Sequence, residues 1–369
     1  MKIAFITTNL RGGGAEKAVI NLASVLAGRG HEVHVILMER IIEHALPATF
    51  ALHALSPKKG KVTKGLLGKY LCAFRLRRLI QELGGSAPFN LIVSTLPFAD
   101  EVAALAGIEP LWHRVANTLS SEISLLRERH PGKAARRYDR YRRLYNGANV
   151  IAVSEGVRED LRGSFQLDQA RIEQIYNPFD VAAINELADQ PGPDLPDFPY
   201  VLHVGRFAPQ KRHDLLLEAW RGVNAAGHKL VFLTKPSEKL DALIEASGLR
   251  SRVVVAGFRE NPYPWIKNAR LLVLCSDHEG MPNVLVEALA CGTPVVSTDC
   301  PSGPRELLAG TGGGVLVPVG DADALRLAIQ RSLDYPPVLG VADLTSFDAL
   351  QVAERYEHLP KLWRTKKKA

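Results

Sequence analysis

The chain has 369 residues, a formal net charge of +7 and a mean hydropathy of −0.02. This length exceeds what one ordinary hydrophobic core requires and suits two domains. A hydrophobic content of 46% indicates a globular protein, and no apolar run reaches the roughly 18 residues of a membrane-spanning helix.

The positive charge is concentrated in the first half of the chain. Residues 1–180 hold 25 Lys and Arg against 17 Asp and Glu, whereas residues 181–369 hold 21 against 22. We expect Lys2–Thr8 to be a strand rather than a secretory signal, because Arg11, three glycines and Glu16 follow it instead of a cleavage site. The four cysteines lack metal-ligand spacing, which favours reduced thiols and no zinc site.

Short apolar runs alternate with helical patterns through the first half. This alternation predicts an α/β domain, with a parallel sheet covered by helices on both faces. The predicted strands are Ile3–Thr7, Val33–Leu37, Leu91–Thr95 and Val150–Ser154, and the predicted helices include Ala15–Ala27 and Leu66–Leu83.

A proline-rich stretch at residues 189–199 interrupts this pattern and is predicted to be a linker. The same alternation then resumes, which predicts two doubly wound, Rossmann-like domains, 1–188 and 200–345, facing a central cleft. Residues 346–369 add a final helix that Pro360 should kink. The predicted strands of the second domain are Val201–Val204, Leu230–Leu233, Val253–Ala256, Leu271–Cys275 and Pro294–Ser297.

A glycine-rich turn, RGGGAE at Arg11–Glu16, follows the first strand and opens a helix. Backbone amides in such a turn can approach an anion without obstruction by side chains. A dinucleotide fingerprint would need a third glycine where Lys17 stands. Glu39 could still serve as a ribose-binding acid, so an NAD(P)-dependent oxidoreductase remains an alternative, as does a purely structural turn.

Two cations follow the first strand of the second domain, in the sequence HVGRFAPQK at His203–Lys211. The strand ends at Gly205, and Arg206 and Lys211 stand five residues apart. At the carboxyl end of a strand, the planar fork of Arg206 and the point charge of Lys211 can converge on one diphosphate.

Two glutamates, Glu279 and Glu287, lie between a predicted strand and the helical pattern of Asn283–Ala290. The backbone amides of Gly280 to Val284 would form a positive helix N-terminus that can hold phosphate or sugar oxygens. Carboxylates accept hydrogen bonds from hydroxyl groups, which suits a ligand with hydroxylated rings. The alternative is a pair of solvated glutamates.

Taken together, these residues resemble the retaining GT4-type glycosyltransferases of the GT-B fold, over nearly the whole chain. The specific signal is the pair Glu279 and Glu287 within EGMPNVLVEALACGTPVV, and the other motifs are individually modest. The resemblance is also carried by Gly12–Glu16, by Gly205 and Arg206 with Lys211, and by the C-terminal helix.

The resemblance implies a role for each of these residues. Arg206 and Lys211 would bind the donor diphosphate, Glu279 the sugar hydroxyls and Glu287 the ribose. The C-terminal helix would cross back to the first domain. The donor's own phosphate would accept the acceptor proton, without a metal or other cofactor. The remaining donor-binding residues would be Gly13, Gly14, Gly205, Gly280, Met281, Pro282, Asn283 and Val284, and the catalytic set would be Glu279, Arg206, Lys211 and His113.

The chain departs from the family pattern at three places. Many relatives carry a histidine in the loop after a central strand, near the acceptor, whereas here Ala116 or Asn117 aligns there and His113 comes earlier. Whether His113 or Asn117 contacts the acceptor stays open. The usual glycine pair is replaced by Thr234–Ser237, which leaves donor-base contacts open. An Asp-x-Asp at Asp321–Asp323 opens a helical stretch, where an N-cap is favoured over a metal site.

Two basic segments, Leu66–Leu83 and Arg136–Arg143, combine cations with apolar or aromatic residues. This pattern is typical of helices that lie on an anionic membrane surface, although an ordinary solvated face is the alternative. No nucleic-acid module is present. The expected acceptor or membrane face comprises Lys64, Lys69, Arg75, Arg78, Asn117, Arg136, Arg137, Arg140 and Arg143.

The sequence therefore predicts a retaining glycosyltransferase on the cytoplasmic face of the membrane. It would transfer a sugar from a nucleotide-sugar, expected to be a UDP-sugar, to a glycan or lipid-linked acceptor in cell-surface polysaccharide biosynthesis. A non-catalytic scaffold of the same fold is a further alternative. Such a scaffold would have lost Glu279, Arg206 or Lys211, and all three are present.

Overall fold

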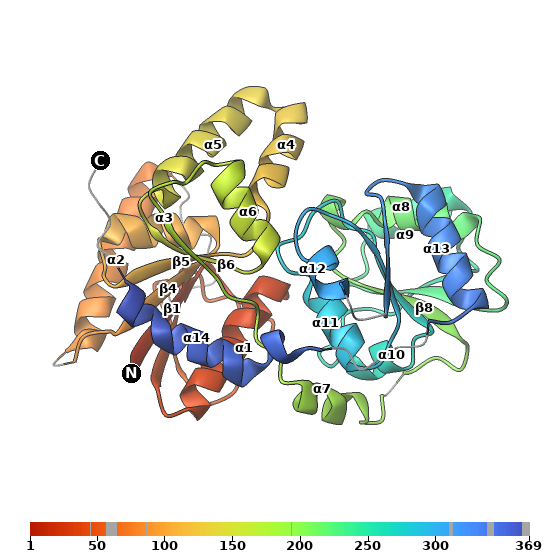
Figure 1. Ribbon diagram of the computed structural model, residues 1–369, viewed down its shortest axis with the longest axis horizontal. Coiled ribbons are helices and arrows are strands. Elements are labelled where there is room, and N and C mark those ends of the chain that lie inside the picture. Colours follow the sequence, from red (N-terminus) through yellow and green to blue (C-terminus); the bar gives the residue numbers. More distant parts are fainter. Residues whose placement is uncertain are drawn as a thin grey trace. The chain divides into compact units, whose positions relative to one another are not determined.

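The computed structural model describes residues 1–44, 46–56, 65–85, 87–192, 194–309, 313–337 and 343–363. The contacts divide the chain into two units (Figure 1). Unit 1 comprises Met1–Pro178 and Ser346–Ala369, and unit 2 comprises Phe179–Thr345. In the described part of the chain, no helix is both long and apolar enough to span a membrane.

Unit 1 is built on a parallel sheet with seven strands in its described residues, in the order β3-β2-β1-β4-β5-β6-β7. The central strands are continuous apolar runs, as expected for strands covered on both faces. Phe5 of the central strand pairs with Val35 on one side and Val93 on the other. The strands are β1 (Lys2–Thr7), β2 (Glu32–Leu37), β3 (Ala51–Ala54), β4 (Leu91–Thr95), β5 (Leu111–Val115), β6 (Asn149–Ala152) and β7 (Arg171–Gln174).

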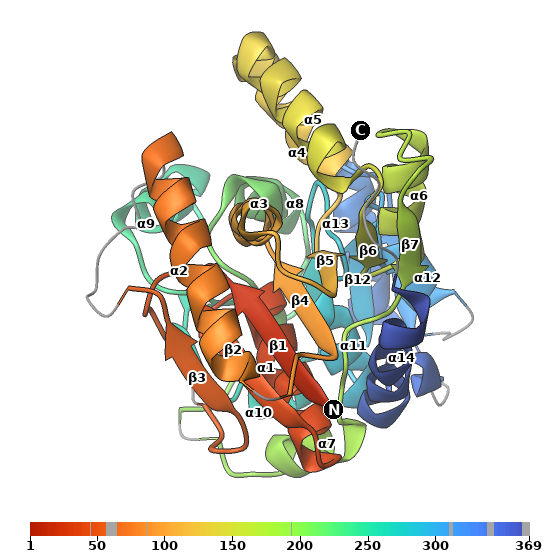
Figure 2. The same ribbon diagram turned by 90° about the vertical axis from the view of Figure 1, so that its left-hand side faces the viewer.

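Helices cover both faces of this sheet. Helices α1 and α14 pack on the face that carries Ile3 and Phe5, and α2 and α3 pack on the face that carries Ala4 and Ile6. Helices α4 and α5 form a hairpin that projects beyond the sheet (Figure 2). The helices of the unit are α1 (Gly14–Gly28), α2 (Leu66–Gly84), α3 (Pro97–Ala106), α4 (Leu119–Arg129), α5 (Pro131–Tyr145), α6 (Glu155–Gly163) and α14 (Ala349–Leu362).

The last helix, α14, completes the core of unit 1. Its Val352 and Tyr356 are almost fully buried in the same cluster as Phe5. Glu357 fixes it to α1 through Arg29, with 2.6 Å between Oε1 and Nε. The hydrogen bond from Arg29 holds the pKa of the Glu357 carboxyl down to about 2. Pro360 lies in the last turn of this helix.

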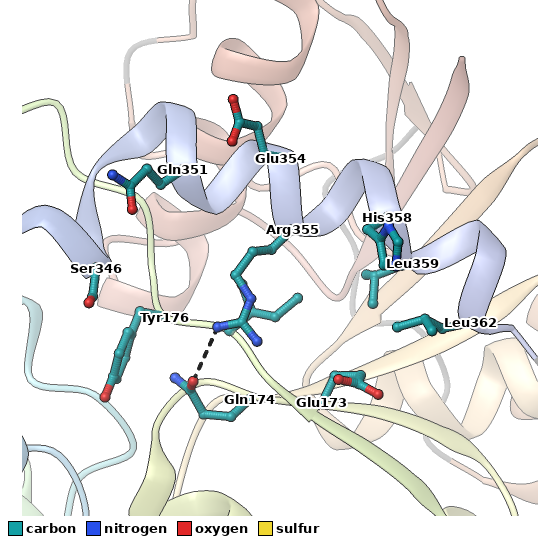
Figure 3. Close-up of a pocket in the computed structure, with 11 residues that line it drawn as sticks. Glu173, Gln174, Tyr176, Ser346, Gln351, Glu354, Arg355, His358, Leu359 and Leu362 are labelled. Atoms are coloured by element: carbon teal, nitrogen blue, oxygen red, sulfur yellow. Dashed lines mark hydrogen bonds between the residues drawn. The ribbon is translucent and has the colours of Figure 1, made fainter.

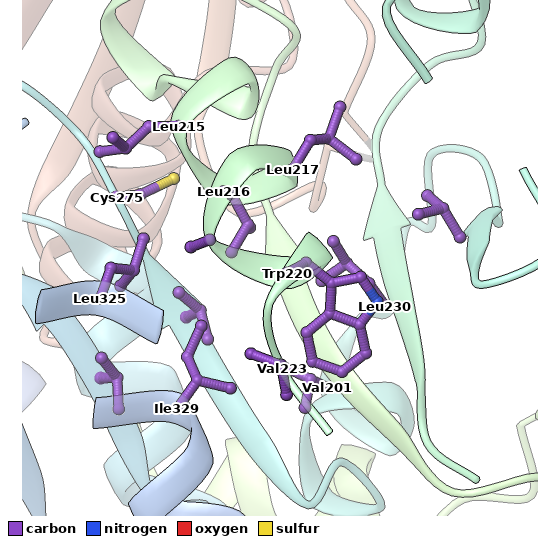
Figure 4. Packing of buried hydrophobic residues seen from close by; sticks show 14 of the residues in the cluster. Val201, Leu215, Leu216, Leu217, Trp220, Val223, Leu230, Cys275, Leu325 and Ile329 are labelled. Carbon is purple, nitrogen blue, oxygen red and sulfur yellow. The ribbon is translucent and has the colours of Figure 1, made fainter. Parts of the chain in front are cut away.

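Unit 2 has a parallel sheet of six strands in its described residues, in the order β10-β9-β8-β11-β12-β13. Helices α8 and α13 pack on one face, where Trp220, Leu325 and Ile329 form the core shown in Figure 4. The elements are α7 (Val181–Ala188), β8 (Tyr200–Val204), η1 (Pro209–Lys211), α8 (His213–Arg221), β9 (Lys229–Leu233), α9 (Glu238–Ser247), β10 (Val253–Val255), α10 (Tyr263–Lys267), β11 (Leu271–Leu274), α11 (Asn283–Ala290), β12 (Val295–Thr298), α12 (Pro304–Leu308), β13 (Gly314–Val317) and α13 (Ala322–Asp334).

The predicted α/β fold with two parallel sheets is confirmed. Helix α7 packs against α10 and α11, so the contacts place it in unit 2 and not in the predicted first domain, 1–188. Asp321 caps α13 as expected, because its Oδ1 accepts from the amide of Ala324 at 2.8 Å. Four buried cysteines form no disulfide: Cys72, Cys275, Cys291 and Cys300.

Candidate functional site

Lys211 and Glu279 form the centre of a polar site beyond the carboxyl ends of β8 and β11. Lys211 ends the short helix η1, and Glu279 lies in the loop between β11 and α11. The Lys211 ammonium donates to the Glu279 carboxylate, with 2.5 Å between Nζ and Oε1. Glu279 is only 7% exposed, so little water screens the pair. Two predicted donor-site residues are therefore in direct contact.

A second ion pair holds the same two loops together, and the sequence analysis did not find it. Arg212 adopts a left-handed conformation, with φ 47°. Its guanidinium lies 3.1 Å from Asp214 Oδ2 and 2.8 Å from Asp277 Oδ1. These hydrogen bonds raise the pKa of Arg212 further above its ordinary value. The amide of Asp277 also donates to the carbonyl of Gln210 at 2.9 Å, so both loops are fixed.

Two buried histidines lie close to Lys211. The rings of His203 and His213 meet edge to face, 4.7 Å between centroids, and Phe232 packs against the His213 ring. Burial, and to a smaller extent the nearby charge of Lys211, lowers the pKa of His213 to about 4. Burial likewise lowers the pKa of His203 well below its ordinary value. Both rings are therefore neutral at neutral pH and add no charge beside Lys211.

The N-terminus of α11 is fixed by close backbone packing. The helix begins at Asn283, with Pro282 as its N-cap, and Glu287 lies about one turn further on, 5% exposed. Gly303 has φ 96°, and a Cβ there would lie 2.3 Å from Pro282 Cδ. Both the conformation and the lack of space require glycine. Buried residues also include Gly280, Met281 and Val284.

The loop after β8 presents Arg206 to solvent. Among the described residues, no carboxylate forms an ion pair with the exposed guanidinium of Arg206. The missing Cβ of Gly205 would lie 3.7 Å from Lys211 Cδ, which places this glycine beside the Lys211 side chain. The hydroxyl of Thr234 accepts from the amide of Phe207 at 3.1 Å. Thr234 therefore supports the Arg206 loop.

The predicted glycine turn of unit 1 is packed against its own helix. Gly13 is the N-cap of α1, and Gly14 is the first helical residue. A Cβ on Gly13 would lie 2.2 Å from Glu16 Oε2. A side chain at position 13 would therefore have to displace the Glu16 carboxylate.

His113 belongs to a closed hydrogen-bonded cluster in unit 1. The Ser94 hydroxyl donates to Asp100 Oδ1 at 2.5 Å, and Tyr145 donates to Asp100 Oδ2 at 2.8 Å. His113 Nδ1 lies 2.8 Å from Ser94 Oγ and must donate, because that hydroxyl already donates to Asp100. His113 is 3% exposed, whereas Asn117 is half-buried in the loop after β5. No motif in the sequence predicts the roles of Ser94, Asp100 or Tyr145.

Helix α2 exposes an apolar stripe, formed by Leu67, Tyr70, Leu71 and Phe74, of which Leu67 is 87% exposed. These positions are three and four residues apart, so they share one face of the helix. The predicted cations Arg75 and Arg78 are exposed on the same helix, although Arg78 pairs with Glu82. Lys64 lies outside the described residues.

Two of the predicted cations of α5 form ion pairs with glutamates. Arg137 pairs with Glu122 at 2.5 Å and Arg140 with Glu101 at 3.0 Å. Lys69 of α2 also pairs with Glu101, so this carboxylate links α2 to α5. Arg136 and Arg143 are exposed on α5.

Two family models together match most of the chain. Residues 12–183 match "Glycosyltransferase Family 4", and residues 198–334 match "Glycosyl transferases group 1". The chain belongs to the GT4-type glycosyltransferases. A relative from Campylobacter jejuni is 28% identical over 342 residues, 90% of each chain. It is named N-acetylgalactosamine-N,N'-diacetylbacillosaminyl-diphospho-undecaprenol 4-alpha-N-acetylgalactosaminyltransferase.

Solved structures confirm the GT-B fold of this glycosyltransferase. Sucrose-phosphate synthase from Thermosynechococcus elongatus superposes with a TM-score of 0.77 at 18% identity, covering 98% of each chain. Anabaena HepE in complex with UDP and glucose gives 0.71 at 22% identity, over 98% of this chain and 100% of that one. None of the matches described supports the oxidoreductase alternative.

Proposed function

We propose that this glycosyltransferase moves a sugar from a UDP-sugar to a glycan or lipid-linked acceptor, with retention of configuration and without a metal or other cofactor. The observation that carries the proposal is the 2.5 Å pair of Lys211 and buried Glu279 beside the N-terminus of α11. The diphospho-undecaprenol named in the Campylobacter relative supports a lipid-linked acceptor. The UDP and glucose in the HepE complex support the donor.

The cations act on the donor diphosphate. Departure of UDP leaves negative charge on its terminal phosphate, and Lys211 and Arg206 stabilise that charge more in the transition state than in the ground state. Glu279 holds the Lys211 ammonium in position before the donor arrives. Lys211 and Arg206 together supply the charge that a divalent metal would otherwise supply.

The carboxylates and the α11 N-terminus hold the rest of the donor. Glu279 accepts hydrogen bonds from the sugar hydroxyls and Glu287 from the ribose, because carboxylates are acceptors only. The backbone amides at the start of α11 bind donor oxygens. These amides belong to Gly280, Met281, Asn283 and Val284. Pro282, which lacks an N–H, shapes the turn, and Gly205 borders Lys211.

Retention follows when the leaving phosphate accepts the proton of the acceptor hydroxyl. The new bond then forms on the face that the leaving group vacates, and no enzymic nucleophile is needed. We assign acceptor contact to Asn117, place the Gly13–Gly14 turn at the junction of donor and acceptor, and assign a structural role to His113. The 3% exposure of His113 and its hydrogen bond to Ser94 support this choice.

The acceptor side lies on the cytoplasmic surface of an anionic membrane. The exposed stripe of α2 can enter the headgroup region while nearby Arg75 and the exposed Arg136 and Arg143 of α5 meet anionic lipid. This arrangement suits an acceptor that is itself carried on a lipid diphosphate.

Ligand-induced stabilisation tests the proposal. Saturating UDP should raise the Tm, since a ligand at 100 times its Kd adds about 2.7 kcal/mol of stability. NAD and NADP should leave the Tm unchanged. A shift with NAD(P) but not with UDP would favour the oxidoreductase alternative.

Catalysis is tested separately with a panel of UDP-sugars and a lipid-diphosphate-linked sugar acceptor. We expect acceptor-dependent release of UDP and a product whose anomeric configuration, read by NMR, matches that of the donor. UDP binding without transfer to any acceptor in the panel would instead favour the scaffold alternative. Activity that EDTA abolishes and Mg²⁺ restores would contradict the metal-free mechanism.

A further inference from the structure

The turn that carries Lys211 contains a residue with a strained backbone. Arg212 follows Lys211 directly and is the N-cap of α8, with φ 47° and ψ 48°. This left-handed conformation is unfavourable for a residue with a Cβ, whereas glycine adopts it readily. Such a conformation persists only where the surrounding contacts hold it, and it is typical of functional sites.

The guanidinium of Arg212 supplies contacts of this kind. Its Nη2 donates to Asp214 Oδ2 at 3.1 Å, and its Nη1 donates to Asp277 Oδ1 at 2.8 Å. Asp277 belongs to the loop between β11 and α11, which also carries Glu279. Because two carboxylates already bind the Arg212 guanidinium, we expect it to act on its neighbours and not on the donor phosphates.

Two further contacts join the same turn to the same loop. The Cys275 Sγ lies 3.1 Å from the carbonyl oxygen of Lys211 and 3.4 Å from that of Arg212. Burial raises the pKa of the Cys275 thiol to about 12, so the thiol stays protonated and can donate to one of these carbonyls. The side-chain amide of Gln210 donates to the carbonyl of His278. The residues on both sides of Lys211 are therefore fixed to the Glu279 loop.

We propose that Arg212 is a positioning residue, which holds the Lys211 turn against the Glu279 loop and so aims the Lys211 ammonium before the donor binds. Lysine has a flexible four-carbon side chain, so the direction of its ammonium depends on how firmly its backbone and its partner are held. A displacement of about 1 Å can lower turnover by up to about 10²-fold. This inference rests on the proposed role of Lys211 at the donor diphosphate.

Arg212→Gly tests the inference because it removes the guanidinium and keeps a residue that suits the left-handed backbone. We expect kcat to fall at least about 10-fold, while the KM for the donor changes less. The Tm should change little, because the relief of strain offsets part of the loss of the ion pairs. Arg212→Lys keeps the charge and one carboxylate partner at a time, so it should restore part of kcat.

Two controls separate the effects that Arg212→Gly combines. Ala226→Gly relieves an exposed left-handed residue of the same unit, with φ 44°, and removes no ion pair. Arg355→Gln removes an arginine that hydrogen-bonds a neighbouring segment. Arg355 borders an open groove of unit 1 and points toward Gln174 (Figure 3), whose Oε1 accepts from it at 3.4 Å. Both controls should keep the kcat of the wild type.

The double variant shows whether Arg212 acts through Lys211. If it does, adding Arg212→Gly to Lys211→Ala lowers kcat no further than Lys211→Ala alone. Effects that multiply would overturn the inference. A wild-type kcat in Arg212→Gly, beside a reduced kcat in Lys211→Ala, would overturn it and leave the proposed function standing. A near-normal kcat in Lys211→Ala would instead contradict the proposed donor site, and the inference would fall with it.

Discussion

Each unit has a cluster in which a buried acid contacts hydrogen-bond donors near the ends of parallel strands: Glu279 in unit 2 and Asp100 in unit 1. The two clusters differ in their exposure to solvent. In unit 2, the Lys211 side chain keeps 20% of its surface exposed beside Glu279. In unit 1, the side chains of His113 and Asp100 are 4% and 1% exposed. The difference shows that an acid beside a base does not by itself mark a reactive site. A substrate can reach the first cluster, whereas the second joins β4, β5, α3 and α5.

The largest expected effect is on turnover, from the open cluster. Lys211→Ala should lower kcat on the order of 10²- to 10³-fold, because it removes a cation aimed at the leaving phosphate. Its unfolding free energy should fall by about 1 kcal/mol, because the buried Glu279 carboxylate loses its cation while the partly exposed site admits water in its place. Steady-state kinetics and urea unfolding check both points, with Lys239→Ala, an exposed lysine of α9, as the control. Near-normal turnover in Lys211→Ala would remove the basis of the site assignment.

The closed cluster should show the opposite response. Asp100→Ala leaves the donors of Ser94 and Tyr145 buried without an acceptor, which should lower the unfolding free energy by about 3 kcal/mol. Turnover per folded molecule should stay close to that of the wild type. Denaturant titration measures the loss, and Asp168→Ala, at an exposed loop position, is the control. A stable Asp100→Ala protein with lost turnover would instead make this cluster catalytic.

The buried histidine beside Lys211 predicts a pH effect of intermediate size. The folded pKa of His213 is about 4, below its ordinary 6.5, so the unfolded chain binds the proton more readily. The contribution of neutral His213 to the unfolding free energy is therefore fully present above pH 6.5, and it is lost as the pH falls toward 4. Between pH 7 and pH 5, the His213→Phe protein should lose less unfolding free energy than the wild type, by on the order of 1–2 kcal/mol.

Urea unfolding at the two pH values measures this difference. His130→Gln, at an exposed position, should keep the full pH dependence of the wild type. If His213→Phe keeps it too, other groups are responsible.

The smallest effect concerns the exposed stripe of α2, which belongs to neither cluster. Replacing Leu67 and Phe74 with serine should weaken binding to phosphatidylglycerol-rich vesicles several-fold, because less apolar surface enters the interface. Stability should stay within about 0.5 kcal/mol, as for other surface changes. Vesicle co-sedimentation at low and high salt measures the binding. Leu327→Ser, on α13, removes an exposed leucine elsewhere and should have no effect.

Much of the fold could be predicted because its central strands are continuous apolar runs. The strands β3, β5, β7 and β13 were not predicted. Of these, β3, β7 and β13 lie at sheet edges, whereas β5 is central but has His113 and Arg114 within its sequence LWHRV. Strand β7, with the sequence RIEQ, shows why: an edge strand needs no apolar residues on both faces, so it lacks the signal of a central strand.

Lys211 and Glu279 could each be predicted as site residues, because each stands in a local motif at the end of a strand, but their ion pair could not. The ion pair of Arg212 with Asp277 had no such signal, because its residues are 65 positions apart and match no spacing rule. The same holds for Tyr145, whose bond to Asp100 spans 45 positions. The residue types in local motifs were therefore enough to predict the chemistry of the cluster around Lys211. The cluster around Asp100 is formed only by tertiary packing, so no local motif predicts it.

The position of α14 has a consequence for the order in which the protein folds. Val352 and Tyr356 complete a core that the first residues of the chain begin, yet they are synthesised after all of unit 2. Domains generally fold as units while the chain emerges from the ribosome. Here unit 2 can finish first, while the apolar face of β1 and α1 stays uncovered until the last helix is released. A ribosome that stalls shortly before residue 349 would therefore present a folded second unit and an incomplete, aggregation-prone first one.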